Sequence, residues 1–111
     1  MAGKEEEASR AEIKWNEKAE RFETDDREAF LQYHLVQIGE GKTAMDMAHT
    51  FVPRSKRGMG LAAKLCDAAF VHARSLSLPV IPTCSYISDT YLPKNPAWSS
   101  LVYKEELKSS M

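Results

Sequence analysis

The stretch Phe51-Val52-Pro53-Arg54-Ser55-Lys56-Arg57-Gly58-Met59-Gly60-Leu61-Ala62 decides how this chain folds. It leads from an apolar segment, typical of a strand, through a basic loop with two glycines into small residues typical of a helix start. Glycines let a phosphate approach the backbone amides, and the dipole at a helix N-terminus favours an anion. The stretch therefore predicts a strand–loop–helix unit that holds a polyanionic cofactor.

The charges around this loop support the same interpretation. No carboxylate occurs between Asp46 and Asp67, while four cations lie in that interval: Arg54, Lys56, Arg57 and Lys64. The net charge of the whole chain is only −1. The positive charge is therefore local to the loop, as a phosphate site requires, and the chain lacks the generally basic surface of a nucleic-acid-binding protein.

Two common phosphate-binding patterns do not fit the loop. A P-loop needs G-x-x-x-x-G-K-[ST], but after Gly58 the chain has Ala63 for the second glycine and Leu65 for the hydroxyl residue. A dinucleotide fingerprint fits Gly58, Gly60 and Ala63, yet it expects an acidic residue about 20 positions later. The next strand ends at residues 83–85 without one.

A third pattern, [RQ]-x-x-G-x-[GA], is carried by Arg57-Gly58-Met59-Gly60-Leu61-Ala62 after the Val-Pro that closes the strand. It resembles the acyl-coenzyme A loop of the GNAT acetyltransferases, in which successive amides wrap the pyrophosphate. The chain is also similar, over about residues 12–108, to a compact branch of that family that is closest to plant members. The motifs that carry this likeness are His49-Thr50, Val52-Pro53, Arg57-Gly58, Gly60-Leu61-Ala62 and Cys84-Ser85-Tyr86.

Composition predicts one small soluble domain. With 111 residues, 43% hydrophobic and 28% charged, the chain resembles an ordinary globular protein. Residues 1–10 are polar and acidic, with no apolar run of a signal peptide, and we expect a disordered tail before a single domain at 11–111. Two cysteines make no disulfide framework. We expect an intracellular monomer, in the cytoplasm or nucleus and without a membrane segment.

The fold that these patterns predict is α/β, of the α+β kind. Four strand-like segments precede the loop with no helical segment between them, which favours an antiparallel meander; they lie at residues 12–15, 20–23, 29–38 and 44–52. A helix with one apolar arc is expected over residues 57–75. A short strand over residues 78–83 then completes a β–loop–α–β unit.

The chain after the helix is interrupted by prolines. Pro79 and Pro82 cannot donate to a strand ladder, so the second parallel strand should be an edge or should splay from its neighbour. A short helix is expected over residues 85–91, broken by Pro93 and Pro96, with a last turn at 101–107. The resemblance implies that a cofactor lies where the two parallel strands splay apart.

The candidate catalytic residues are Cys84 and His49. Cys84 follows the second parallel strand. The resemblance places a cysteine here, either as a nucleophile or as a proton-transfer group. The alternative is that Cys84 is a semi-buried cysteine with a structural role alone. Alternation puts His49 on the strand face of Met45, Met47 and Phe51, where it is a core histidine or a base or activator of Cys84. Tyr86 and Tyr91 are weaker candidates for protonating the coenzyme sulfur.

The candidate cofactor-binding residues are those of the loop, its strand and one asparagine beyond: Val52, Arg54, Lys56, Arg57, Gly58, Met59, Gly60, Leu61, Ala62 and Asn95. The resemblance implies acetyl-coenzyme A as co-substrate and an amine or protein lysine as acceptor. No metal site is expected. The chain has no room for the helices that build the acceptor site in longer family members. The alternative function is therefore a non-catalytic coenzyme A-binding or protein-interaction module.

Overall fold

The computed structural model describes residues 13–103, and both the predicted tail at 1–10 and the residues from 104 onward lie outside this range. Five strands form one sheet in the order of the chain, β1-β2-β3-β4-β5. The first four are β1 (Ile13–Asn16), β2 (Arg21–Thr24), β3 (Phe30–Gln37) and β4 (Thr43–Phe51). They pair antiparallel, as the predicted meander requires, because only short turns join them.

Strand β4 contains one extra residue that the sequence pattern does not reveal. Gln32 of β3 pairs with His49, whereas the next residue, Tyr33, pairs with Met47. Ala48 is therefore a β-bulge. Since successive strand residues alternate between faces, one inserted residue reverses the alternation for the rest of the strand.

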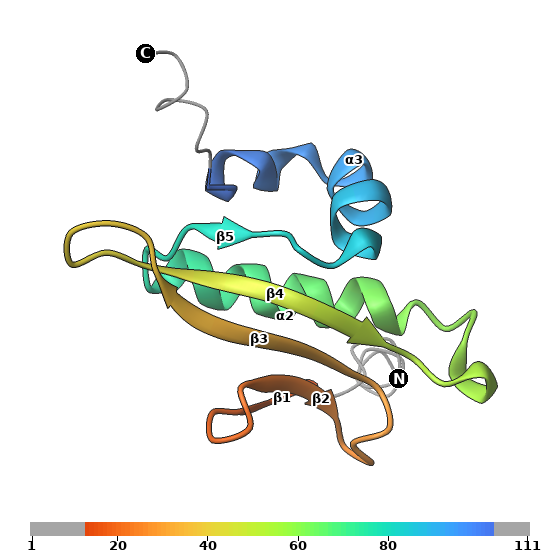
Figure 1. Cartoon of the computed structure of the whole chain (residues 1–111). Coiled ribbons are helices and arrows are strands. Elements are labelled where there is room, and N and C mark those ends of the chain that lie inside the picture. Colours follow the sequence, from red (N-terminus) through yellow and green to blue (C-terminus); the bar gives the residue numbers. More distant parts are fainter. Residues whose placement is uncertain (1–12, 104–111) are drawn as a thin grey trace, which may run out of the picture.

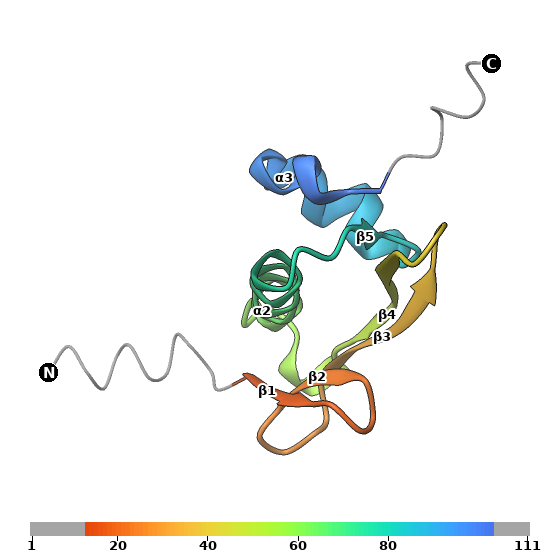
Figure 2. The same ribbon diagram turned by 90° about the vertical axis from the view of Figure 1, so that its left-hand side faces the viewer.

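Helix α2 (Leu61–Ser75) covers one face of the sheet (Figures 1 and 2). Five of its buried residues lie on the predicted apolar arc, namely Leu61, Leu65, Cys66, Ala69 and Ala73, and the sixth is Phe70, whereas Leu76, also predicted on that arc, is 54% exposed. Phe70 is buried by a second layer, because its ring lies 5.5 Å from that of Tyr91 and 5.3 Å from that of Trp98. The helix is thus enclosed by the sheet on one side and by the C-terminal segment on another.

The helix starts later than predicted. Residues 57–60 belong to the loop, because Gly58 has φ of +90° and Gly60 has φ of +73°, which no right-handed helix contains. Gly60 is instead the residue that caps the helix, and the hydrogen bond from the Lys64 amide to the Gly60 carbonyl, 3.1 Å long, closes the first turn.

Strand β5 (Val80–Ile81) is much shorter than predicted, because Pro79 and Pro82 stand directly on either side of it. It pairs in parallel with β4 through Met45 and Asp46. The last backbone hydrogen bond recorded between the two segments, 2.9 Å long, runs from the Cys84 amide to the Met47 carbonyl. Beyond it β4 continues to Phe51 paired with β3 alone, so the two parallel strands splay apart.

The chain after β5 is helical over residues 85–94. Its middle, η2 (Ile87–Tyr91), is a π turn, and it runs into α3 (Leu92–Lys94). Pro93, predicted to break this helix, lies inside it; proline has no amide and crowds the carbonyl four residues earlier, so widened turns accommodate it. A 3₁₀ segment, η3 (Pro96–Leu101), follows and Val102 returns to pair with Val80.

Candidate active site

The basic loop is folded by its own backbone and by one arginine. Residues Arg54–Lys56 form a 3₁₀ turn, η1, and the Arg57 amide donates to the Arg54 carbonyl at 3.2 Å. The Arg57 Nε donates to the Val52 carbonyl, also at 3.2 Å, and so ties the loop back to the end of β4. Gly58 and Gly60 then turn the chain into α2 through left-handed conformations.

The amides at the start of α2 are available to a ligand. The first intrahelical bond is made by the Lys64 amide, so the amides of Leu61, Ala62 and Ala63 have no acceptor four residues earlier within the helix. Their dipoles add to that of the helix and point out of its N-terminus. No carboxylate lies in the first turn. An anion at this end would therefore meet backbone donors without opposing negative charge.

A hollow of about 180 Å³ lies directly over these amides. Seven of the ten predicted cofactor-binding residues line it, together with Ala63 and Tyr86: Val52, Lys56, Arg57, Gly58, Gly60, Leu61 and Ala62. Tyr86 comes from the segment that follows β5. The hollow is therefore bounded by both arms of the splay. Met59, exposed at 62%, and Arg54 lie outside this lining.

Lys56 has a second role that the sequence did not suggest. Its ammonium lies 2.8 Å from a carboxylate oxygen of Asp26 and 3.6 Å from one of Glu28, both in the β2–β3 turn. The hydrogen bond with Lys56 holds the pKa of Asp26 well below its usual range, and the same contact raises the pKa of Lys56. Lys56 therefore joins the loop to the sheet as well as lining the hollow.

Cys84 stands at the point where the strands separate. It is 9% exposed, and its Sγ lies 3.5 Å from Oγ1 of Thr50 on β4. Its carbonyl accepts the amides of Ile87 and Ser88, so the residue also begins the helical segment that follows. Cys84 thus belongs to the edge of the core, and its thiol has Thr50 as a polar partner.

Groups near Cys84 keep their protons. Cys66 of α2 is fully buried, and burial raises the pKa of its thiol above the ordinary value, with Cys84 and Asp67 adding to the effect. Burial also raises the pKa of Tyr86, which lies within electrostatic reach of Cys84. The Tyr86 phenol is therefore a proton donor, and no base, near neutral pH. Cys66 packs in the core, as its position on the helix predicted.

The prediction that His49 shares a strand face with Met45 and Met47 is wrong. Those two are fully buried, whereas His49 is exposed and pairs with Gln32 on the opposite face. Its ring lies 6.1 Å from that of Phe30, which in turn lies 5.7 Å from that of Phe51. The bulge at Ala48 is the cause, because it turns Thr50 inward and His49 outward.

Two further candidates have structural partners. The Asn95 side-chain amide donates to the Tyr91 carbonyl at 2.9 Å and thereby ends the helical segment. The Tyr91 hydroxyl donates to Asp67 at 2.5 Å, and burial, followed by this bond, raises the pKa of that phenol. Neither side chain lines the hollow over the loop.

Thr50 is the polar contact that sequence reasoning missed. Simple alternation gave it the solvent face, because it follows His49, and nothing in the local pattern marks Ala48 as an insertion. The likeness to the motif His49-Thr50 was the single available signal. Asp26 and Glu28 were missed as well, since the contact that they make with Lys56 is between distant parts of the chain.

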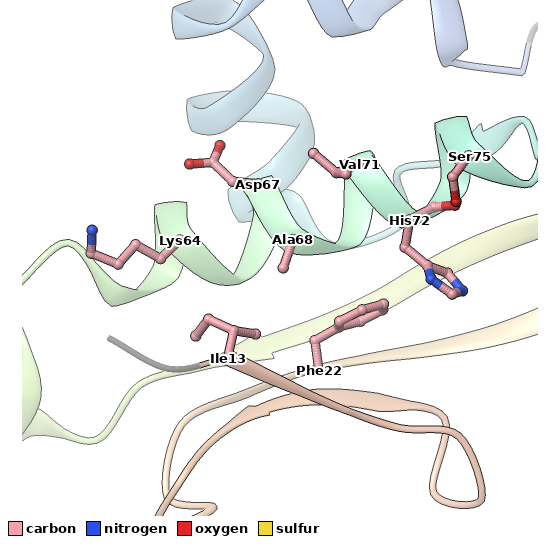
Figure 3. A pocket seen from close by; sticks show the side chains of 8 residues that line it. All are labelled: Ile13, Phe22, Lys64, Asp67, Ala68, Val71, His72 and Ser75. Carbon is pink, nitrogen blue, oxygen red and sulfur yellow. The ribbon is translucent and has the colours of Figure 1, made fainter. Parts of the chain in front are cut away.

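A larger groove, of about 630 Å³, lies between the first hairpin and α2 (Figure 3). Ile13 and Phe22 form one wall, while Lys64, Ala68 and His72 belong to the helix wall. Of the loop cations it contains only Lys64, and none of the predicted catalytic residues. The smaller hollow is the one where the glycine loop, the amides at the start of α2 and Tyr86 meet.

Every helix within residues 13–103 is too short or too polar to cross a lipid bilayer. In the same range, no three His, Cys, Asp or Glu side chains gather closely enough to hold a metal ion.

Comparison with known families agrees with the geometry. The model of a family described as GCN5-related N-acetyl-transferase matches residues 18–101 of the chain. The matched region runs from the turn between β1 and β2 to the end of η3 and so contains the whole loop, the splayed strands and Cys84.

Proposed function

The chain belongs to the GCN5-related N-acetyltransferase family, and from that premise we propose that it transfers an acetyl group from acetyl-coenzyme A to an amine. The observation that carries the proposal is the hollow over the loop, where two positive-φ glycines, the free amides of α2 and Tyr86 meet beside a splayed strand pair. The closeness to plant members of the family stays a prediction.

The coenzyme's pyrophosphate would lie against the amides of residues 58–62. Arg57 and Lys56 line the same hollow, and Arg54 stands exposed on the adjoining turn. The hydrogen bond to the Val52 carbonyl already fixes the Arg57 side chain. Binding a phosphate would therefore cost little further conformational entropy of that side chain. The pantetheine arm would then follow the gap between β4 and the segment after β5 toward Cys84.

The register between β3 and β4 indicates which backbone amide would contact the thioester oxygen. The Tyr33 amide donates to the Glu20 carbonyl and so points toward β2. Since peptide groups alternate along a strand, Leu31 also faces β2, and its partner Thr50 must turn its own amide toward the gap. Outside the ladders between strands, the described part of the chain offers no backbone acceptor to that amide. It would stabilise the oxyanion of the tetrahedral intermediate.

Two routes through Cys84 balance the reaction. In the first, the Cys84 sulfur attacks the thioester, coenzyme A leaves as its thiol with the cysteine's proton, and the amine then takes the acetyl group and returns a proton to Cys84. In the second, the amine attacks the thioester directly. Cys84 then gives its proton to the departing thiolate and regains one from the new amide nitrogen.

His49 fits the amine side of either route. It is exposed on the outer face of β4, at the level where the strands have separated, and the described structure gives it no contact with Cys84. A neutral imidazole there would accept the proton that the incoming ammonium must lose. The acceptor would be a small amine or a protein lysine that approaches an open face, since no helix separates the first strands.

Calorimetric titration with acetyl-coenzyme A and coenzyme A tests the cofactor half. We expect micromolar binding by the wild type and its loss in Gly60→Asp, which adds a carboxylate where the phosphates would lie. Gly41→Asp is the matched control, because Gly41 also has positive φ but lies in the β3–β4 turn. Wild-type protein that binds neither ligand would remove the proposal.

Turnover with a panel of amines tests the catalytic half. We expect Cys84→Ala to keep its affinity for acetyl-coenzyme A and to lose at least a hundredfold in kcat. Cys66→Ala, which alters the core thiol alone, controls for general loss of packing. A wild type that binds the cofactor yet acetylates no amine would favour the non-catalytic binding module, which the open acceptor side also suits.

A further inference from the structure

We infer that Thr50 is a positioning residue for the Cys84 thiol: its hydroxyl fixes the direction of the sulfur and stabilises the sulfur while it carries negative charge. The inference rests on the proposed function for the chemical role of the Cys84 sulfur. It adds to that function a residue that orients the sulfur. It is carried by the contact of 3.5 Å between the Cys84 Sγ and the Thr50 Oγ1.

The bulge in β4 is what makes this contact possible. Without Ala48, Thr50 would face solvent and His49 would face the core. With it, Thr50 shares a face with Leu31, which is fully buried, and its side chain meets the segment that follows β5. A bulge bends and re-aims a strand beside a site at the cost of one ladder position. In β4 the bulge therefore places the Thr50 hydroxyl, and not the His49 imidazole, next to the Cys84 sulfur.

A hydroxyl suits this position because it can reverse its role. Toward a neutral thiol it accepts the S–H proton, as the contact with Thr50 allows. Once the sulfur has lost its proton, or while it carries partial negative charge in either route, the same hydroxyl rotates and donates to it. Hydrogen bonds to charged groups are stronger than those between neutral groups. The exchange needs no movement of the backbone.

The other groups near the sulfur are poorly suited to this task. Within the described residues, those that interact electrostatically with Cys84 are Cys66 of α2 and Tyr86, and Asp67 of α2 acts on both of these. The amide of Cys84 is taken by the Met47 carbonyl. Asp46, on β4, is occupied by the Thr83 hydroxyl at 2.5 Å. In contrast to these groups, Thr50 makes a hydrogen bond to the Cys84 sulfur itself.

The test measures the reactivity of Cys84 in the 111-residue chain without any acetyl acceptor. Iodoacetamide alkylation is followed from pH 6 to pH 10, and the two cysteines are separated by trypsin. Cleavage after Lys64, Arg74 and Lys94 places Cys66 and Cys84 on different peptides. Alkylation of each thiol is therefore read independently, and buried Cys66 reports any general opening of the fold.

Three variants decide the outcome. Thr50→Val keeps the shape of the side chain and removes the hydroxyl. We expect Cys84 alkylation at pH 7.5 to slow about tenfold and the midpoint of its pH profile to move to higher pH. A tenfold change corresponds to the loss of about one hydrogen bond to a charged group. Thr50→Ser keeps the hydroxyl and should stay within about twofold of wild type. Thr83→Val removes the neighbouring bond to Asp46 instead and should leave Cys84 unchanged.

Two results would overturn the inference. One is a Thr50→Val protein whose Cys84 reacts as in the wild type across the pH range. The other is a Thr50→Ser protein as slow as Thr50→Val, which would assign the effect to the methyl group and to packing. Failure of the wild type to acetylate any amine would remove the proposed function alone, because the alkylation profile does not depend on turnover.

In an active protein, steady-state kinetics give a second readout. We expect Thr50→Val to lower kcat about tenfold while the KM for acetyl-coenzyme A stays within about twofold, since Thr50 lies outside the hollow over the loop. Thr50→Ser should restore kcat. An equal rise of KM in both variants, with kcat unchanged, would place Thr50 in cofactor binding and would contradict the positioning role.

Discussion

At the scale of single residues, the loop depends on backbone that glycine adopts without strain. Gly60 has φ of +73°, and no atom lies within 4 Å of the Cβ that a larger residue would add. Gly60→Ala therefore meets backbone strain alone, of about 1–2 kcal/mol for a left-handed alanine. We expect urea denaturation to show a loss of that size. Affinity for coenzyme A should fall at least tenfold, because the strain turns the loop amides.

Gly41 separates strain from binding. Its φ of +71° is nearly the same, and it too has open space around it. It lies in the turn between β3 and β4, at the end of the sheet away from the start of α2 (Figure 1). Gly41→Ala should cost similar stability and keep full affinity for the coenzyme. Equal losses of affinity in both variants would contradict the assignment of the loop.

His72 should make the fold sensitive to acid. Its ring lies 4.2 Å from that of Trp15 and 5.4 Å from that of Phe22, and burial lowers the pKa of this histidine below 6.5. The unfolded chain then takes up the proton first, so stability is full above about pH 7 and falls as the pH drops through 6.5.

Thermal unfolding at pH 7.5 and pH 5.5 measures this effect. We expect the Tm of the wild type to fall between the two, and that of His72→Gln, though lower at pH 7.5 through lost packing, to fall less. His34→Gln removes an exposed imidazole and is the control. A wild type and a His72→Gln protein with the same fall in Tm would show that His72 does not carry the acid sensitivity.

At the scale of elements, η1 and the β2–β3 turn act as one unit through Lys56. In Lys56→Met we expect faster amide hydrogen exchange over residues 54–60 and severalfold weaker binding of coenzyme A. Arg54→Met, which removes an exposed cation on the same turn, should weaken binding without raising exchange. The pair with Asp26 should persist in mild acid, because the pKa of Asp26 is held below its usual range and the contact is lost only as the pH falls through that lowered value.

If Lys56→Met leaves amide exchange in the loop unchanged, the ion pairs with Asp26 and Glu28 do not order it. Exposed ion pairs contribute little to the free energy of unfolding. The exchange measurement is therefore preferred to a measurement of global stability.

The sequence predicted the elements better than their details. Alternation and the absence of intervening helices were sufficient for the four antiparallel strands and for the helix on one face. The late start of α2 was missed because an apolar arc does not record φ, although Gly58 and Gly60 carried that information. The loop of the candidate site was found from local residues. Thr50 was not, since the bulge at Ala48 is fixed by pairing with β3.

At the scale of the whole molecule, cofactor binding should stabilise the fold as one unit. A ligand that binds the native state alone adds about 2.7 kcal/mol at one hundred times its Kd. In a domain of this size that corresponds to a rise in Tm on the order of 10 °C. We expect differential scanning calorimetry with coenzyme A to show one transition moved upward. Gly60→Asp should show no shift, and two separate transitions would contradict a single cooperative unit.

The order of the strands has a consequence for how the chain reaches this state. Because neighbours in the sheet are neighbours in the chain from β1 to β5, most pairings close short loops, and topologies of low contact order fold quickly. The parallel pairing of β5 with β4 must wait until the helix between these two strands has formed. During synthesis the meander can therefore assemble while the ribosome still holds residues 80–103. The hollow over the loop, which Tyr86 helps to line, is therefore completed last, and a chain released before residue 86 would lack it.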